Sequence, residues 1–160
     1  MQMIARRLSY NLIIAWVLLV FSTATFAATS VKDDVQKAYQ SWCAAIGTAK
    51  GNPQEVVKYY APNAILLPTL SPKLLRNKDG GLDVYFKKLT SNPEIKCNPQ
   101  ELITNTYGDL AINSGFYSFS FLKDGKETNV PARFTFVYQK QGKQWLIINH
   151  HSSLLPEDEH

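Results

Sequence analysis

The sequence has few cysteines, few arginines and no long apolar run. Only two of its 160 residues are cysteines, which excludes a disulfide-dense scaffold. Its longest uninterrupted apolar run, Leu12 to Phe21, has ten residues, well short of the roughly 20 that cross a bilayer as a helix. No P-loop, dinucleotide fingerprint or G-x-S-x-G motif is present, and no repeat of fixed period is visible. What remains is a chain with the length of one ordinary domain.

The first 27 residues have the pattern of a secretory signal peptide. Arg6 and Arg7 form a positive segment, the apolar run follows, and a stretch of small and polar residues ends at Ala27. The alternative is a membrane anchor, which the short apolar run disfavours. We therefore predict that residues 1–27 are cleaved, that residues 28–160 form one domain, and that the protein is exported to the periplasm without a stable membrane anchor.

Charge and cysteine usage narrow the possible partners. Without Arg6 and Arg7 the balance is 15 basic residues against 13 acidic ones, and the lysines are scattered, so we do not expect a nucleic-acid partner. In an oxidising compartment Cys43 and Cys97 could form a disulfide, which would contribute about 4 kcal/mol by the chain-entropy estimate. The alternative is two unpaired cysteines, Cys43 on a helix and Cys97 in an unrelated loop.

Hydrophobic periodicity predicts three helices followed by an antiparallel meander, an α+β fold. Apolar residues at three- and four-residue intervals predict helices after Ser30, Asn52 and Gly81. Beyond Gln100 the period changes to two, with turn signals at Gly108-Asp109, Asp124-Gly125 and Gln141-Gly142. The predicted strands are Ala64–Leu67, Glu101–Tyr107, Leu110–Leu122, Asn129–Gln139 and Gln144–Ser153.

The turns also predict which strand residues face each other. A two-residue turn at Asp124-Gly125 places Arg133 opposite Phe116, and a turn centred on Gln141-Gly142 places Arg133 opposite His150. An odd loop length would exchange His150 for His151. The other sheet face would be aromatic and buried. Because three helices cover only part of one face, we predict that the sheet is also buried against another copy of the chain.

Few residues in the sequence are placed to carry chemistry. Arg133 lies mid-strand in a run without other charges, so its guanidinium must reach water, an acid or an anionic ligand. His150 and His151 point to opposite faces of one strand, which argues against a shared metal ion. A lone buried histidine is also commonly a hydrogen-bonded core residue. Paired carboxylates for acid–base work are not found within the strands, so the sequence leaves open whether the protein is an enzyme.

Three segments near the C-terminus resemble a known family. They are Ala132-Arg133-Phe134-Thr135-Phe136-Val137-Tyr138, Gly142-Lys143-Gln144-Trp145-Leu146-Ile147-Ile148 and His150-His151-Ser152-Ser153-Leu154-Leu155-Pro156. Together with the segment from Tyr60 to Thr69, they resemble the bacterial branch of the association-domain group of calcium/calmodulin-dependent protein kinase II, within the NTF2-like superfamily.

The resemblance implies an NTF2-like cone, with three N-terminal helices packed on a curved, mostly antiparallel sheet, a pocket between them, and homo-oligomers assembled through the sheet. It implies no kinase activity, because no kinase domain is attached. Family members of the kinase type have pocket arginines that bind carboxylates. One of these falls at Ser152 here and another nearest Thr135, so that Arg133 would have to substitute.

The favoured hypothesis is an exported, homo-oligomeric module that binds a small polar or anionic molecule in its cone, with no cofactor and no metal. The candidate ligand-binding residues are Arg133 for the anion, His150, Ser152, Thr135 and His151 beside it, and Tyr59, Tyr60 and Thr69 at the mouth. One alternative is a small-molecule isomerase or hydratase with a histidine general base. A second is an oligomerisation scaffold without a ligand.

Overall fold

The computed structural model describes residues 30–69 and 71–156, so the predicted signal peptide lies outside the described residues. The three predicted helices and the meander are confirmed. None of the described helices is long and apolar enough to cross a membrane. The elements, in chain order, are α1 (Val31–Thr48), α2 (Gln54–Val57), β1 (Tyr60–Leu67), β2 (Leu75–Arg76), a 3-10 turn (Asn77–Asp79), α3 (Gly81–Thr90), β3 (Lys96–Tyr107), β4 (Leu110–Lys123), β5 (Lys126–Gln141) and β6 (Gln144–Leu154).

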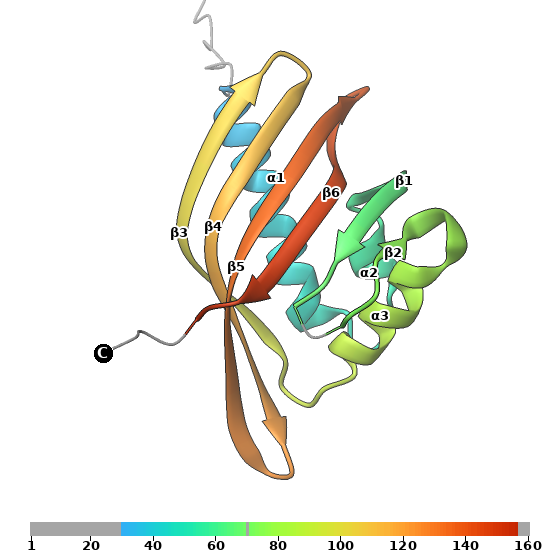
Figure 1. Ribbon diagram of the computed structural model, residues 1–160, viewed down its shortest axis with the longest axis vertical. Coiled ribbons are helices and arrows are strands. Elements are labelled where there is room, and N and C mark those ends of the chain that lie inside the picture. The colour runs from blue at the N-terminus through green and yellow to red at the C-terminus, as the bar shows by residue number, and fades with distance from the viewer. Residues whose placement is uncertain (1–29, 70, 157–160) are drawn as a thin grey trace, which may run out of the picture.

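The six strands form one curved sheet in the order β2-β1-β6-β5-β4-β3. All neighbouring pairs are antiparallel except β1 and β6, which run parallel. In Figure 1, α1 runs behind β3 to β6, and no described helix lies in front of these four strands. The sheet therefore has a covered face, which points toward α1, and an open face, which points away from it.

The helix α1 packs on the covered face of the sheet and buries the core. Ser30 begins it with a capping box, because its hydroxyl accepts a hydrogen bond from the Asp33 amide at 3.1 Å and the Asp33 carboxylate accepts one from the Ser30 amide at 3.2 Å. Its buried stripe packs on the aromatic residues of the sheet: Tyr39 stacks on Phe134 with ring centroids 5.2 Å apart, and Trp42 meets Phe136 edge-on at 4.9 Å. The prediction that an aromatic sheet face is buried is confirmed.

The edge strand β3 is held in place by a close backbone approach and by a covalent bond. Gly115 of β4 is required where the pairing of β3 and β4 shifts register, because a Cβ there would collide with the backbone carbonyl of Glu101. A disulfide joins Cys43 of α1 to Cys97 of β3, with Cα atoms 5.3 Å apart. The bond fixes the helix against the strand farthest from β1.

The hairpin of β4 and β5 has the predicted register. Asp124 and Gly125 form its two-residue turn, both with left-handed φ angles, 52° and 74°, as a tight turn between right-twisted strands requires. Lys123 pairs with Lys126 across this turn, and Arg133 faces Phe116.

The register predicted for β5 and β6 is wrong, and two facts explain the error. The turn is Gly142-Lys143 rather than Gln141-Gly142, because Gln141 pairs with Gln144. A β-bulge then follows: Tyr138 faces Ile147, but Val137 faces Asn149, so β6 carries one extra residue there. Beyond the bulge, the side chains of β6 lie on the faces opposite to those predicted.

Candidate functional site

The covered face carries a buried chain of hydroxyl, imidazole and indole groups. The Trp42 indole N–H donates to the Tyr60 hydroxyl at 3.1 Å, and that hydroxyl lies 2.8 Å from Nδ1 of His150. On the other side of the imidazole, the Tyr117 hydroxyl lies 3.3 Å from Nε2 and donates to the Ser152 hydroxyl at 2.7 Å. We call this set of residues, with Thr69 at its outer end, the polar chain.

The donors and acceptors of the polar chain agree with one direction throughout. Because Tyr60 accepts from Trp42, its own hydrogen is free to donate to Nδ1 of His150. A neutral ring with its hydrogen on Nε2 then donates to Tyr117, which donates to Ser152. Ser152 shares a hydrogen bond with Thr69, which is only half-buried. The chain therefore runs from the core under α1 to a partly exposed hydroxyl.

Burial keeps every titratable group of the polar chain neutral. His150 is 3% exposed, and burial lowers its pKa well below its usual value of 6.5, with the charge of His151 as a smaller cause in the same direction. Burial also raises the pKa values of Tyr60 and Tyr117. At neutral pH the site therefore offers hydrogen bonds but no charge.

The structure brings four of the predicted site residues together and separates the others. Tyr60, Thr69, His150 and Ser152 all belong to the polar chain. Arg133 does not, because its Nε donates to the Ser153 hydroxyl at 3.0 Å and its side chain is exposed. The prediction that Arg133 and His150 share a face is wrong, and the β-bulge in β6 is the physical reason.

Three further predicted residues also lie away from the polar chain. Thr135 and His151 face each other across β5 and β6 on the open face, on the side of Arg133. Tyr59 lies just before β1 and is half-buried in a surface pocket between α1 and the turn of β5 and β6. The implied substitution of a family pocket arginine by Arg133 therefore fails.

Sequence reasoning missed two members of the polar chain. Trp42 and Tyr117 recur with the apolar core residues of α1 and β4, so periodicity alone predicts buried apolar side chains, and both rings are buried. Only the polar atom at the edge of each ring joins the chain. Trp and Tyr usually bond that atom when they are buried, and this was the available signal.

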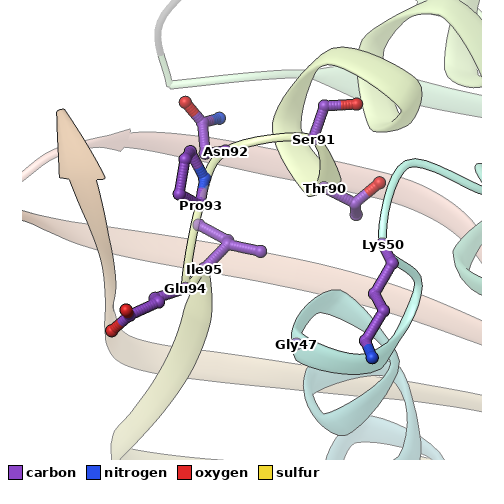
Figure 2. Close-up of a pocket in the computed structure, with 8 residues that line it drawn as sticks. All are labelled: Gly47, Lys50, Thr90, Ser91, Asn92, Pro93, Glu94 and Ile95. Atoms are coloured by element: carbon purple, nitrogen blue, oxygen red, sulfur yellow. The ribbon is translucent and has the colours of Figure 1, made fainter. Parts of the chain in front are cut away.

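A second hollow lies where α1 and α3 end and β3 begins. It has a volume of about 500 Å³ and is lined by the last residue of α3 and the α3–β3 connection, Thr90 to Ile95, together with Gly47 and Lys50 at the end of α1. Figure 2 shows Lys50 and Glu94 pointing away from each other. The hydroxyls of Thr90 and Ser91 bond back to carbonyls of α3. These polar groups thus complete a helix end and do not converge on a ligand.

The described residues do not show the features of an acid–base or metal site. No group of three or more His, Cys, Asp or Glu residues within 30–69 and 71–156 could hold a metal ion. Each His150 nitrogen has a tyrosine hydroxyl as its hydrogen-bond partner, and no carboxylate bonds to the ring in the part of the chain that the structure describes. This arrangement supports the alternative of a hydrogen-bonded core histidine.

Helices on one face of a curved, mostly antiparallel sheet are the arrangement of the NTF2-like fold. The fold comparison agrees: a Streptomyces avermitilis protein provisionally assigned as a dehydratase of the NTF2-like family superimposes with a TM-score of 0.67 at 14% identity, covering 78% of this chain and 96% of that one.

A family model, the calcium/calmodulin dependent protein kinase II association domain, matches residues 31–156. The chain belongs to this family. A Xanthomonas campestris protein provisionally assigned to the same domain is 37% identical, with a TM-score of 0.70, covering 78% of this chain and 87% of that one. The hub homology domain of the Chlamydamonas reinhardtii kinase is 21% identical, with a TM-score of 0.64, covering 79% and 100%. No curated protein is significantly similar to the chain.

Proposed function

We propose that this protein is an exported association module, in which copies of the chain bind one another through the open face of the sheet. The observation that carries the proposal is the composition of that face. Its large apolar residues include Ile103, Tyr107 and Leu110, which are 55%, 61% and 41% exposed. Ile112, Phe116 and Val137 lie half-buried on the same face.

An apolar sheet face of this extent is unusual on a single chain. Antiparallel sheets with one solvated face normally alternate apolar residues toward the core with polar ones toward water. Here both faces of β4 carry large apolar side chains: Tyr117 and Phe119 on the covered face, and Ile112 and Phe116 on the open one. Contiguous exposed apolar surface marks interaction sites. A second copy is the occupant that the family name supports, since a symmetric pair buries the same patch on both chains.

The ligand and enzyme hypotheses have less support from the geometry. A carboxylate in the cone would need a cation there, but Arg133 lies on the open face. A histidine base would need access to a substrate, but His150 is 3% exposed and both ring nitrogens are bonded. The association module is therefore the function that the described residues support best.

A charged pair on the open face tests the proposal. In Ile103→Glu/Tyr107→Glu, both changed side chains are more than half exposed in the single chain, so the fold should not require them. Buried carboxylates at an apolar contact would strongly disfavour association. We expect light scattering to show a smaller assembly than that of the wild type. Val84→Glu is the matched control, because Val84 is 74% exposed on α3. A double variant with the wild-type mass and unfolding temperature would refute the proposal.

A further inference from the structure

A surface pocket on the helix side of the molecule gathers cations around two aromatic rings. It has a volume of about 490 Å³ and lies between α1, the residues before β1, and the turn that joins β5 to β6. Its wall on α1 includes Asp34 and Lys37, its second wall Lys58 and Tyr59, and its third Lys143 and Trp145. We call it the lysine pocket.

The fold leaves this pocket open because β1 is shorter than β6 at that end. Pairing of the two strands begins at Tyr60 and Ile147, where the Ile147 amide donates to the Tyr59 carbonyl at 2.9 Å. The first residues of β6 therefore have β5 on one side and the pocket on the other. One face of α1, with residues at helical spacing, closes the remaining side.

The aromatic rings of the pocket already hold ammonium groups. The Lys58 ammonium lies 5.6 Å from the centroid of the Tyr59 ring, and the Lys140 ammonium lies 5.9 Å from that of Trp145. Trp145 is 6% exposed and Tyr59 is half-buried, so both rings are fixed by the core. Within the lining, the Lys58 ammonium therefore lies close to the Tyr59 ring, whereas Lys140 contacts Trp145 but does not line the pocket.

The charge of the pocket is positive. Three lysines and one aspartate line it. The Lys58 ammonium is partly balanced by Glu55, whose carboxylate lies 2.6 Å away. Lys37 of α1 and Lys143 of the β5–β6 turn supply two further positive charges, against the one negative charge of Asp34. The complementary ligand is therefore an anion.

The free energies of exposed ionic contacts and of aromatic contacts indicate which kind of anion would bind. A solvent-exposed ion pair contributes only about 0–1 kcal/mol, so a bare inorganic ion would bind weakly to surface lysines. An aromatic ligand gains about 0.5–1.5 kcal/mol from each favourable ring contact, in addition to the burial of apolar area. Both contributions together favour a ligand that combines an apolar ring with an acidic group.

We propose that the lysine pocket binds a small aromatic carboxylate, with its ring against Tyr59, beside the buried Trp145, and its carboxylate between Lys37 and Lys143. The pocket lies mainly on the α1 side of the sheet, but Leu146, which also lines it, pairs with Gln139 beside Leu110 of the open face. None of the six apolar residues named for the open face lines the pocket, so the substitutions that test ligand binding differ from those that test self-association.

The experiment compares two probes of equal shape, benzoate and its neutral counterpart benzamide, on 15N-labelled protein expressed from the full chain. The readout is the indole N–H resonance of Trp145, with the buried indole of Trp42, which donates to Tyr60, as the internal reference. We expect saturable shifts at Trp145, no shift at Trp42, and about tenfold tighter binding of benzoate. Inorganic phosphate should bind more weakly than benzoate.

Two pairs of substitutions complete the test. Lys37→Gln/Lys143→Gln should weaken benzoate binding about tenfold and leave benzamide binding unchanged. Lys87→Gln/Lys88→Gln, an exposed pair on α3, is the matched control and should leave both unchanged. Equal affinity for the two probes in the wild type, no saturable shift, or indifference to the first pair would each overturn the proposal. The comparison of probes in the wild type decides the matter even where a variant fails to fold.

Discussion

At the scale of single residues, His150 shows how one extra residue in a strand changes the role of a side chain. The β-bulge turns it toward α1, where two tyrosine hydroxyls bond to its nitrogens. A buried imidazole with both nitrogens bonded holds β1, β4 and β6 in a fixed relation. Its neighbour His151 faces the opposite way and is exposed.

The burial of His150 predicts a loss of stability in acid. Its pKa is lowered in the folded chain, so the unfolded chain, with an ordinary value near 6.5, binds a proton first as the pH falls. Between that value and the lower folded one, the free energy of unfolding should decrease by about 1.4 kcal/mol per pH unit from this group alone. Above pH 6.5 the group has no such effect.

Urea unfolding at pH 7 and pH 5 measures this effect. His150→Gln should be less stable than the wild type at pH 7 but should lose less stability on acidification. His151→Gln, altered on the open face, should behave like the wild type. An equal acid loss in wild type and His150→Gln would show that His150 does not contribute to the pH dependence.

At the scale of elements, the disulfide is the strongest single restraint on α1. It joins the helix to β3 across 54 residues of chain. A loop of this length corresponds to about 4 kcal/mol by the chain-entropy estimate. Because α1 covers the aromatic residues of the sheet, the bond stabilises the core as well as the edge strand.

We expect Cys43→Ala/Cys97→Ala to lower the free energy of unfolding by about 2–4 kcal/mol. Urea titrations of the wild type with and without reductant check the origin of the loss. The reduced wild type should fall to nearly the value of the variant, while the variant should not respond to reductant. A wild type that is unaffected by full reduction would argue against this role.

The elements themselves could be predicted from the sequence, but their register could be predicted only in part. The capping box at Ser30 and the turn at Asp124-Gly125 are local signals, and both elements begin or turn there. The bulge carries no such signal, since Ile147, Ile148 and Asn149 include neither glycine nor proline. The strand β3 is predicted to begin at Glu101 but begins at Lys96. A proline usually interrupts a strand, but Pro99 is tolerated here because β3 lies at the edge of the sheet.

The candidate site could be predicted only in part, because its composition depends on the register of β5 and β6. Tyr60, Thr69, His150 and Ser152 were predicted as site residues and are brought together, whereas Arg133, Thr135 and His151 lie on the other face. The lysine pocket could not be predicted, because its lysines come from three segments that are distant in sequence and carry no common motif. Convergence of that kind depends on tertiary structure alone.

At the scale of the whole molecule, the disulfide and the predicted signal peptide point to the same compartment. Disulfides persist in oxidising environments such as the periplasm. We expect the protein recovered from the periplasm of expressing bacteria to begin near Ala28, as N-terminal sequencing would show. Substitution of Arg6 and Arg7 by glutamate should reduce the exported amount. Periplasmic material that still begins at Met1 would contradict the proposed cleavage.

The central claim is that the open face of the sheet joins copies of this chain. Sedimentation velocity of the wild-type protein at micromolar concentration tests it most directly, because it measures the assembly without any substitution. The account predicts a sedimenting species with the mass of two or more chains, which dissociates only on further dilution. A single species with the mass of one chain throughout that range would contradict it.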